Sequence, residues 1–438
     1  MNEPNTNPES TPENDPPESR APRRISRGPW KTLWSRLLKN RLAVWGGLLL
    51  IFLYAVSCFA GFLSPYRYDD GDASTLLYGP MLFGSYTAEL KEIFADETGR
   101  EYSRYERTWK WFSGGVHFHD SEGSFSLRPH VHPLREYESF DEHLEREFLV
   151  AADPTVSVPI EFFVRGEQSH EIASLCGFFP VEGTLHLFGV KHPEGAAGST
   201  RVYLLGSDTQ GRDLLTRILY GGQISLSVGI LGITLSMGIG IVIGGLSGYF
   251  GGIFDFFAMR LVELLMAIPG FYLILTLRAA IPRDLDSQTT YLIIVAILAL
   301  AGWASTGRVV RGMVLSLKEN EYSIAAKALG ASHGRIIFKH VLPNTASFVI
   351  VTATLFVPYY ILGEVALSFL GVGITEPETS WGLLLKDAQN SKILKYHPWL
   401  VIPGFFIFVA VLAFNFLGDG LRDAADPRAF ISKGKKDE

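Results

Sequence analysis

Six long apolar runs constrain this chain more than any other feature of its sequence. The first, residues 42–63, is uncharged and about 22 residues long, enough for a helix that rises about 1.5 Å per residue to cross a bilayer. Five more runs of this kind lie at 223–246, 257–281, 289–306, 345–370 and 398–417. With 47% hydrophobic residues, the sequence therefore predicts an all-α membrane protein with six transmembrane helices.

The N-terminal segment, residues 1–41, predicts the orientation of the first helix. Residues 1–29 are rich in Pro, Asn, Glu and Ser, so we expect a disordered tail. Eight Lys and Arg residues and no acidic residue lie between Arg20 and Arg41, and basic segments of this kind stay on the cytoplasmic side. A cleavable signal peptide is the alternative, but its apolar core is shorter and no small-x-small cleavage site follows the run.

Residues 64–205 have the composition of a water-exposed domain. They hold 12 Lys and Arg against 23 Asp and Glu. Short β-like runs occur at 107–112, 124–127, 155–164 and 184–190. We expect a β-rich extracytoplasmic (periplasmic) insert between the first and second spans.

Alternation of the spans from an inside N-terminus predicts the remaining topology. The loop 307–344 and the tail after 418 are then cytoplasmic and carry six and five basic residues, more than the outside loops. The expected location is the cell inner (cytoplasmic) membrane, multi-pass, with both termini cytoplasmic. The expected organisation is a tail at 1–41, a first helix at 42–63, the insert at 64–205, a five-span core at 206–428 with the loop 307–344, and a cytoplasmic tail at 429–438.

The segment 318–344 is too polar to span the membrane but has helical periodicity. Tyr322, Ala325, Ala326 and Leu329 are spaced i, i+3, i+4 and i+7, which places them on one face of a short helix. Gly330 suits a left-handed cap, Ser332 can cap a second helix, and Pro343 suits the first turn of the next span. The pattern predicts a helix–turn–helix whose small apolar face either docks onto another protein or packs under its own bundle.

This segment resembles the cytoplasmic loop of ATP-binding-cassette (ABC) importer permeases. That loop, the EAA loop, has Glu-Ala-Ala, three residues, Gly, nine residues and Ile-x-Leu-Pro. The matching residues here are Ala325, Ala326, Gly330, Leu342 and Pro343, whereas Ile324 and His340 depart from the pattern.

Three further segments resemble the dipeptide, oligopeptide and nickel branch of these binding-protein-dependent permeases. They are residues 206–213 with the run that follows them, 364–373 with Trp381 and Gly382, and 414–428. Ser207 or Asp208 is expected to cap a short amphipathic helix lying on the outer interface.

The resemblance implies a six-span permease subunit and its partners. These are a second permease subunit, two ABC ATPase subunits and a periplasmic solute-binding protein that delivers a peptide-like solute. The loop 318–344 would insert its first helix into the ATPase, with Tyr322, Ala325, Ala326, Leu329, Gly330 and Ser332 as the ATPase-coupling residues. The chain has no GxxxxGK[ST] segment, so ATP and Mg belong to the partner subunits and we expect no cofactor or enzymatic activity here.

Ionisable residues inside spans are scarce, because an unpaired one costs about 3 kcal/mol at the bilayer centre. Arg260 and Glu263, at i and i+3, are expected to pair with each other. Glu364 has no partner nearby in sequence, so it either contacts a peptide ammonium or makes an interhelical hydrogen bond. The candidates for the translocation path are Glu364, Glu263 and Asn415.

Two other patterns have alternative interpretations. Gly240, Gly244, Gly248 and Gly252 offer a close-packing face, either within the bundle or toward a second subunit. The pairs His117/His119 and His130/His132 in the insert could chelate a metal from one face of a strand, although such pairs are more often solvated, and we expect no metal site.

Two other classes of protein, and other cargoes, compete with this interpretation. A secondary transporter should show inverted repeats with paired broken helices, which the sequence lacks. A membrane-embedded hydrolase should carry a segment such as G-x-S-x-G or H-E-x-x-H, and none is present. The formal charge of −6 gives no reason to expect a nucleic-acid partner, whereas membrane lipid is expected. Nickel or another small solute is the alternative cargo.

Overall fold

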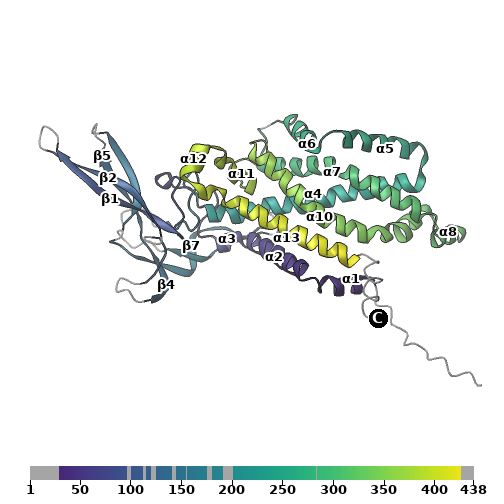
Figure 1. The fold of residues 1–438 in the computed structure, drawn as a ribbon, viewed down its shortest axis with the longest axis horizontal. Coiled ribbons are helices and arrows are strands. Elements are labelled where there is room, and N and C mark those ends of the chain that lie inside the picture. The colour runs from purple at the N-terminus through teal and green to yellow at the C-terminus, as the bar shows by residue number, and fades with distance from the viewer. Residues whose placement is uncertain are drawn as a thin grey trace, which may run out of the picture.

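The computed structural model describes residues 29–95, 100–111, 115–119, 125–140, 145–153, 155–174, 180–190, 201–282 and 284–425. A bundle of long helices forms one part, and a β-rich part lies at one end of it (Figure 1). The long helices are α1 (Pro29–Leu37), α2 (Arg41–Cys58), α4 (Leu214–Phe250), α5 (Gly252–Ala267), α6 (Gly270–Ala279), α7 (Ser287–Leu317), α10 (Ala346–Phe369) and α13 (Ile402–Ala425).

Shorter helices connect the long ones. They are α3 (Ala60–Leu63), η1 (Ala73–Thr75), α8 (Glu321–Ala328), α9 (His333–Arg335), η2 (Ile336–Val341), η3 (Leu342–Thr345), α11 (Trp381–Lys386), η4 (Asp387–Gln389), α12 (Ser391–Tyr396) and η5 (Pro398–Val401). Pro343 lies in η3 at the start of the α10 helix, as predicted.

Among the described residues, five helices are long and apolar enough to cross a membrane, or six if the bent pair α5 and α6 counts as one span. The expectation of one straight helix over 257–281 is wrong, because these two helices meet at 93°. Pro269 lacks a backbone N–H and pushes the residue before it out of the helical region, and Ile268 accordingly has φ −90° and ψ 129°.

The other long apolar helices lie close to the positions of the expected spans, with shifted ends. The first helix is interrupted at Phe59, so that α2 and α3 together cover the run 42–63. α7 continues to Leu317, well past the expected end at 306, so the first third of the loop 307–344 is helix. Arg36 donates a hydrogen bond to the carbonyl of Ala424 (3.0 Å), which brings α1 and the end of α13 together at the bundle end opposite the strands.

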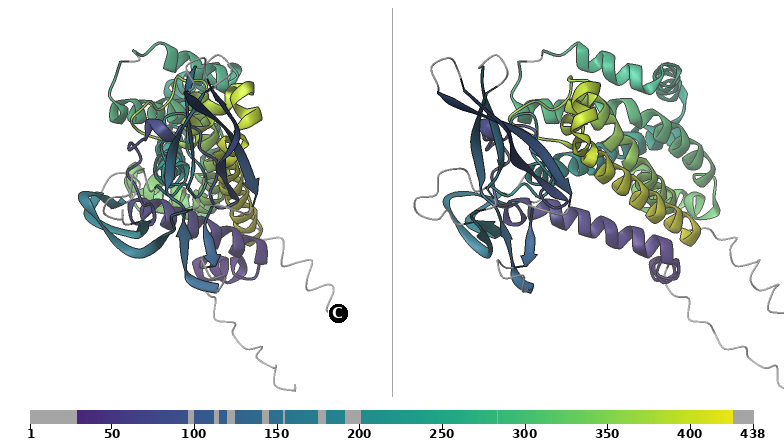
Figure 2. Two further views of the ribbon diagram at one scale, coloured as in Figure 1. Left: turned by 90° about the vertical axis from the view of Figure 1, so that its left-hand side faces the viewer. Right: turned by 60° about the vertical axis from the view of Figure 1, so that its left-hand side comes forward.

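The β-rich insert is present between α3 and α4, and Figure 2 shows its strands gathered at one end of the bundle. One sheet has the order β2-β1-β6-β5 and the other β3-β4-β7-β8. The strands are β1 (Gly84–Ala95), β2 (Glu101–Trp111), β3 (His117–His119), β4 (Phe125–Val131), β5 (Leu134–Phe140), β6 (Arg146–Ala152), β7 (Val158–Ser174) and β8 (Pro180–Val190).

The four predicted β-like runs fall within β2, β4, β7 and β8, apart from end residues. Phe112 and Ser124 of those runs lie outside the described residues. The predicted runs do not include β1, β3, β5 or β6.

The glycine face of α4 packs within the bundle. A Cβ added at Gly240 would lie 2.9 Å from Thr306, and one at Gly244 only 2.3 Å from the carbonyl oxygen of Gly307, both on α7. Gly248 faces α7 in the same way, whereas Gly252 belongs to α5 and has nothing within 4 Å. Close approach of α4 and α7 is therefore the role of the first three glycines.

Replacing Gly244 by Ala is expected to destabilise the chain by about 1–3 kcal/mol, because the new methyl group must push α4 away from the α7 backbone. Gly238→Ala on the same helix is the matched control. Nothing lies within 4 Å of its added Cβ, so the gain in helix propensity should leave stability unchanged or higher. Thermal unfolding in detergent measures both, and equal midpoints for the two variants would contradict the packing role.

Candidate functional site

The helix–turn–helix predicted at 318–344 is present, at the end of the bundle farthest from the strands (Figure 1). α8 ends before Gly330, whose φ of +80° is the left-handed value that suits glycine. The Ser332 side chain then accepts a hydrogen bond from the backbone N–H of Arg335 (3.4 Å) and caps α9. These local elements are confirmed.

The predicted apolar face of α8 divides between two environments. Tyr322 and Ala325 are exposed, and Leu329 just beyond the helix is 88% exposed, an unusual position for a leucine. Ala326 instead packs against a small buried cluster that includes Val310 and Ile336. Within this face, Ala326 therefore packs against its own bundle while the other three residues remain exposed.

Polar contacts connect this loop to the neighbouring spans. The Lys318 ammonium donates to the carbonyl of Gly248 at the end of α4 (3.0 Å). The Tyr249 hydroxyl lies 2.9 Å from Nδ1 of His333. Arg311 on α7 pairs with Asp255 on α5. Contacts of the loop 307–344 therefore reach both α4 and α5.

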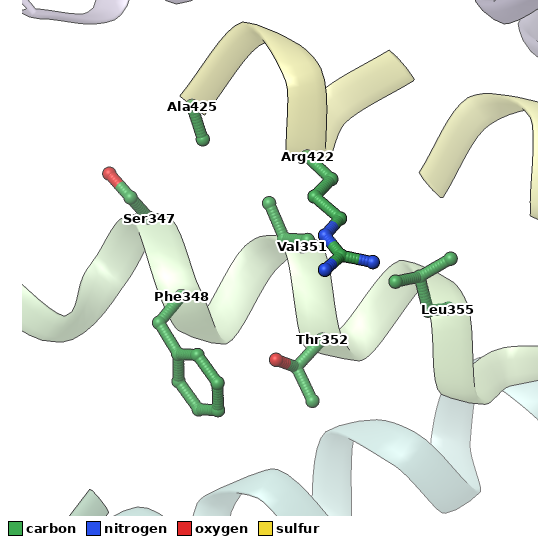
Figure 3. Close-up of a pocket in the computed structure, with 7 residues that line it drawn as sticks. All are labelled: Ser347, Phe348, Val351, Thr352, Leu355, Arg422 and Ala425. Atoms are coloured by element: carbon green, nitrogen blue, oxygen red, sulfur yellow. The ribbon is translucent and has the colours of Figure 1, made fainter. Parts of the chain in front are cut away.

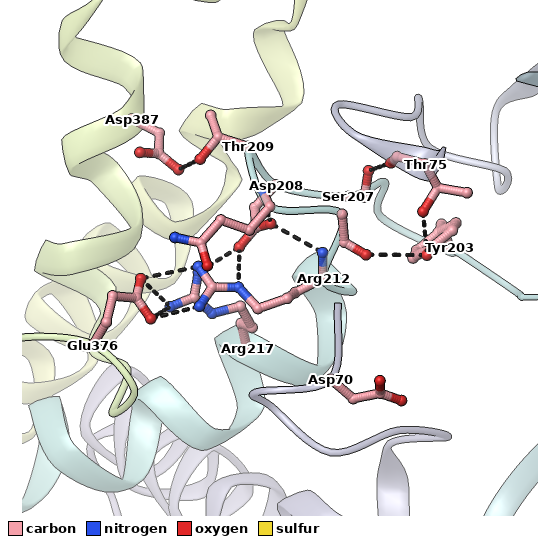
Figure 4. Close-up of polar contacts among 12 residues, drawn as sticks. Asp70, Thr75, Tyr203, Ser207, Asp208, Thr209, Arg212, Arg217, Glu376 and Asp387 are labelled. Carbon is pink, nitrogen blue, oxygen red and sulfur yellow. Dashed lines mark hydrogen bonds and ion pairs between the residues drawn. The ribbon is translucent and has the colours of Figure 1, made fainter. Parts of the chain in front are cut away.

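A second polar site lies at the opposite end, where the insert joins the bundle (Figure 4). We call it the mouth cluster, and it consists of Asp208, Arg212, Arg217 and Glu376. Asp208 is 1% exposed and pairs with both arginines. Glu376, from the loop after α10, accepts from both guanidinium groups, at 2.5 Å from Arg212 and 3.0 Å from Arg217. Four charges thus tie the start of α4 to that loop.

The sequence itself contains a signal for this cluster. Acidic and basic residues alternate over 208–217 at the start of a long apolar helix, where unpaired charge is costly. The expected interfacial helix capped by Ser207 or Asp208 is wrong. Asp213 caps α4 instead, by accepting from the Thr216 backbone N–H (2.8 Å), and α4 continues unbroken into the span.

Burial of the Asp213 carboxylate makes stability depend on pH. Burial raises the pKa of Asp213 from 3.8 to about 6, against the hydrogen bonds from Thr216. A carboxyl with a raised folded-state pKa adds stability that is present below about pH 4 and lost as pH rises through about 6.

Asp213→Asn keeps the cap but has no carboxyl group to titrate. As pH rises from 4 to 6, the free energy of unfolding of the wild type should therefore fall by about 1–3 kcal/mol relative to that of this variant. Unfolding midpoints measured for both proteins across this range provide the test. Parallel pH profiles would contradict the assignment.

Glu364 on α10 lies at the centre of a buried hydrogen-bond network within the bundle. It is 0% exposed and accepts from the hydroxyls of Ser225 on α4 (2.9 Å) and Ser368 on its own helix (2.7 Å). Ser225 in turn accepts from the backbone N–H of Trp381, and Ser368 accepts from that of Ile374. Of the two expectations for Glu364, the structure therefore contains the interhelical hydrogen bond, and its partner Ser225 was not identifiable from sequence.

The other polar candidates in the expected spans lie apart from this network. Arg260 and Glu263 form the expected pair, at 2.5 Å, on the exposed face of α5. Arg278, the third ionisable residue in the run 257–281, is buried and donates to the carbonyls of Ile281 and Pro282 at the end of α6. Asn415 is partly buried on α13. The structure does not bring Glu364, Glu263 and Asn415 into a single site.

A groove of about 490 Å³ opens between α10 and α13 (Figure 3). Ser347, Val351 and Thr352 line it from α10, and the Arg422 side chain reaches toward them from α13. Its walls are mainly apolar and it is open on one side. It lies near the ends of α10 and α13 that face away from the insert.

The insert histidines show limited clustering. His117 pairs across the sheet with His130, and its ring centroid lies 5.0 Å from that of His132. Within the described part of the chain, no three His, Cys, Asp or Glu side chains come together as metal ligands would. Asp120, which directly follows His119, lies outside the described residues.

Two family models match this chain, and both describe transport permeases. Residues 240–431 match the model of the binding-protein-dependent transport system inner membrane component, and residues 28–80 match the N-terminal transmembrane domain of oligopeptide transport permease C. The chain belongs to this permease family. The two matched segments contain α2 and the α8 loop.

Relatives within the permease family are named as transport proteins rather than as enzymes. The oligopeptide transport system permease protein of Haemophilus influenzae is 45% identical over 227 residues, 52% of this chain and 70% of that protein. The oligopeptide and dipeptide transport system permease proteins of Bacillus subtilis are 40% and 43% identical over 224 residues. Each match covers 51% of this chain, and 71% and 68% of the respective relatives.

Proposed function

We propose that the chain is a six-span permease subunit of an ATP-driven importer of peptide-like solutes. The observation that carries the cargo class is the 40–45% identity to oligopeptide and dipeptide permeases over more than half of the chain. In this proposal the bent pair α5 and α6 counts as the third span. Nickel and other small solutes have no specific observation in their favour.

The proposed orientation places α8 and both termini in the cytoplasm and the insert outside. The basic tail before Arg41 supports this orientation, and so does the position of α1, the end of α13 and α8 at one end of the bundle. The proposed organisation keeps a tail at 1–41, which includes the helix α1, and a first span at 42–63, which α2 and α3 cover together. An insert at 64–205, a five-span core at 206–428 and a C-terminal tail at 429–438 follow.

Coupling to a partner ATPase is proposed to use α8. Tyr322, Ala325 and Leu329 would contact the ATPase, since they are exposed, while Ala326 holds the helix on the bundle and Gly330 with Ser332 shapes the turn. Closure of the ATPase pair would push α8 and reach α4 and α5 through the contacts of Lys318 and Arg311. ATP and Mg would remain on the partners.

The proposed assembly also contains a second permease subunit and a solute-binding protein outside. The insert extends from the end of the bundle that carries the mouth cluster, and a binding protein must bind at this end to deliver its solute.

Glu364, Glu263 and Asn415 remain our candidates for the translocation path. Glu364→Gln keeps the shape of the side chain and so separates contact with a solute from a structural role. Reduced uptake with unchanged thermal stability would support a place for Glu364 in the path. Unchanged uptake would exclude Glu364 from it.

ATP-dependent uptake tests the proposed function. Vesicles containing the full transporter should accumulate a labelled tripeptide only with ATP and an ATPase subunit that has an intact phosphate-binding lysine. Uptake that continues with the lysine-substituted ATPase and follows an ion gradient would indicate a secondary transporter and contradict the proposal.

A further inference from the structure

The hairpin formed by β7 and β8 lies against the end of the first span (Figure 1). His186 Nδ1 on β8 is 2.6 Å from the carbonyl oxygen of Ser64, and the Tyr220 hydroxyl donates to the carbonyl of Glu171 on β7 (2.7 Å). The ring of Phe163 on β7 is 6.4 Å from that of Phe62 in α3. The middle of the hairpin is therefore fixed beside the point where the first span ends.

The depth of this point follows from the length of the first span. α2 has 18 residues, which at about 1.5 Å each gives about 27 Å, close to the thickness of a hydrocarbon core of about 30 Å. Arg41 marks one boundary, so Phe59 and Phe62 lie at the other. The lipid-facing side of α2, with exposed Ile51 and Phe52, continues to Phe59, which is itself exposed.

The hairpin continues this apolar surface. Phe162 and Phe163 are 55% and 64% exposed, although successive side chains of a regular strand face opposite sides. Phe163 has a φ of +57°, a strained value for a bulky residue, and such strain is kept where the surroundings or a function require it. Exposed Arg165 follows and pairs across the hairpin with exposed Leu185.

We propose that this part of the hairpin lies in the headgroup region of the bilayer leaflet on the insert side. Phe162, Phe163 and Leu185 would enter the boundary between headgroups and acyl chains, and Arg165 would contact lipid phosphate. Aromatic side chains beside basic ones are typical anchors at this depth. The insert would then be held at a fixed tilt over the membrane, with the distal sheet of β1, β2, β5 and β6 facing water.

Site-directed spin labelling tests this placement. In a Cys58→Ser, Cys176→Ser background, Phe163→Cys carries a nitroxide, and the full chain with its partner subunits is placed in vesicles of phosphatidylethanolamine and phosphatidylglycerol. We expect the ratio of oxygen to nickel-chelate accessibility to be several-fold higher at 163 than at a matched label replacing Phe148. Phe148 is equally exposed (57%) but lies on β6 of the distal sheet.

A second label at Leu185 repeats the measurement if Phe163→Cys does not fold, and it should show the same high ratio. Nickel-chelate accessibility at 163 and 185 equal to that at 148 would place the hairpin in water and overturn the proposal. A label shielded from both reagents would indicate contact with protein, such as a second permease subunit, and would overturn it as well.

Discussion

Leu329→Asp is expected to abolish ATP-driven uptake while the chain still folds and inserts. The side chain is 88% exposed in the isolated chain, so a carboxylate there costs little by itself. In the proposed assembly Leu329 is buried against the ATPase, where an unpaired charge costs about 3–5 kcal/mol, or at least about a hundredfold in affinity. Binding of the purified ATPase and uptake into vesicles measure the effect.

Leu90→Asp is the matched control for this variant, because Leu90 is also exposed but lies on β1 of the insert. It should leave ATPase binding and uptake within about twofold of wild type. The role of α8 would be wrong if Leu329→Asp bound the ATPase as well as Leu90→Asp does.

Asp208→Asn should be the most destabilising single change at the mouth cluster. Asparagine keeps the shape of the side chain but leaves Arg212 and Arg217 with Glu376 as the one remaining anion among the four groups of the cluster. Removing one partner from a buried ion pair typically costs about 3–5 kcal/mol. Thermal or denaturant unfolding of the full chain in detergent should show that the free energy of unfolding falls by an amount near the lower end of this range.

Asp69→Asn provides the comparison, because the Arg67–Asp69 pair at 3.0 Å has its arginine half exposed. Exposed pairs contribute about 0–1 kcal/mol, so this variant should unfold nearly as the wild type does. Equal losses for Asp208→Asn and Asp69→Asn would show that the mouth cluster contributes no more than a surface pair.

Hydropathy was sufficient to locate the long apolar helices but did not predict their shape. The bend at Pro269 follows from proline chemistry, and the run 257–281 contains the residue that causes it. The extension of α7 to Leu317 was missed because a helix can leave the membrane without ending. β1 and β5 were missed because they carry many charged residues, which tertiary pairing tolerates in strands.

The two candidate sites differ in whether nearby or distant residues in the sequence determine their structure. Gly330 and Ser332 define the α8–α9 turn through their own backbone and side chain, so sequence was sufficient there. The inward orientation of Ala326 depends on Val310 and Ile336, which lie outside its helix. The Ser225 partner of Glu364 is 139 residues away, and Glu376 meets Arg212 from 164 residues away, so those contacts required the structure.

Photocrosslinking from α8 tests most directly whether this chain is driven by a partner's nucleotide cycle. A photoreactive phenylalanine analogue replaces Leu329 in cells that express all subunits, and a second sample carries it at Leu90. We expect an adduct with the ATP-binding subunit from position 329, with a yield that changes when ATP is trapped, and none from position 90. Absence of that adduct from position 329 in cells that still take up peptide would contradict the central claim.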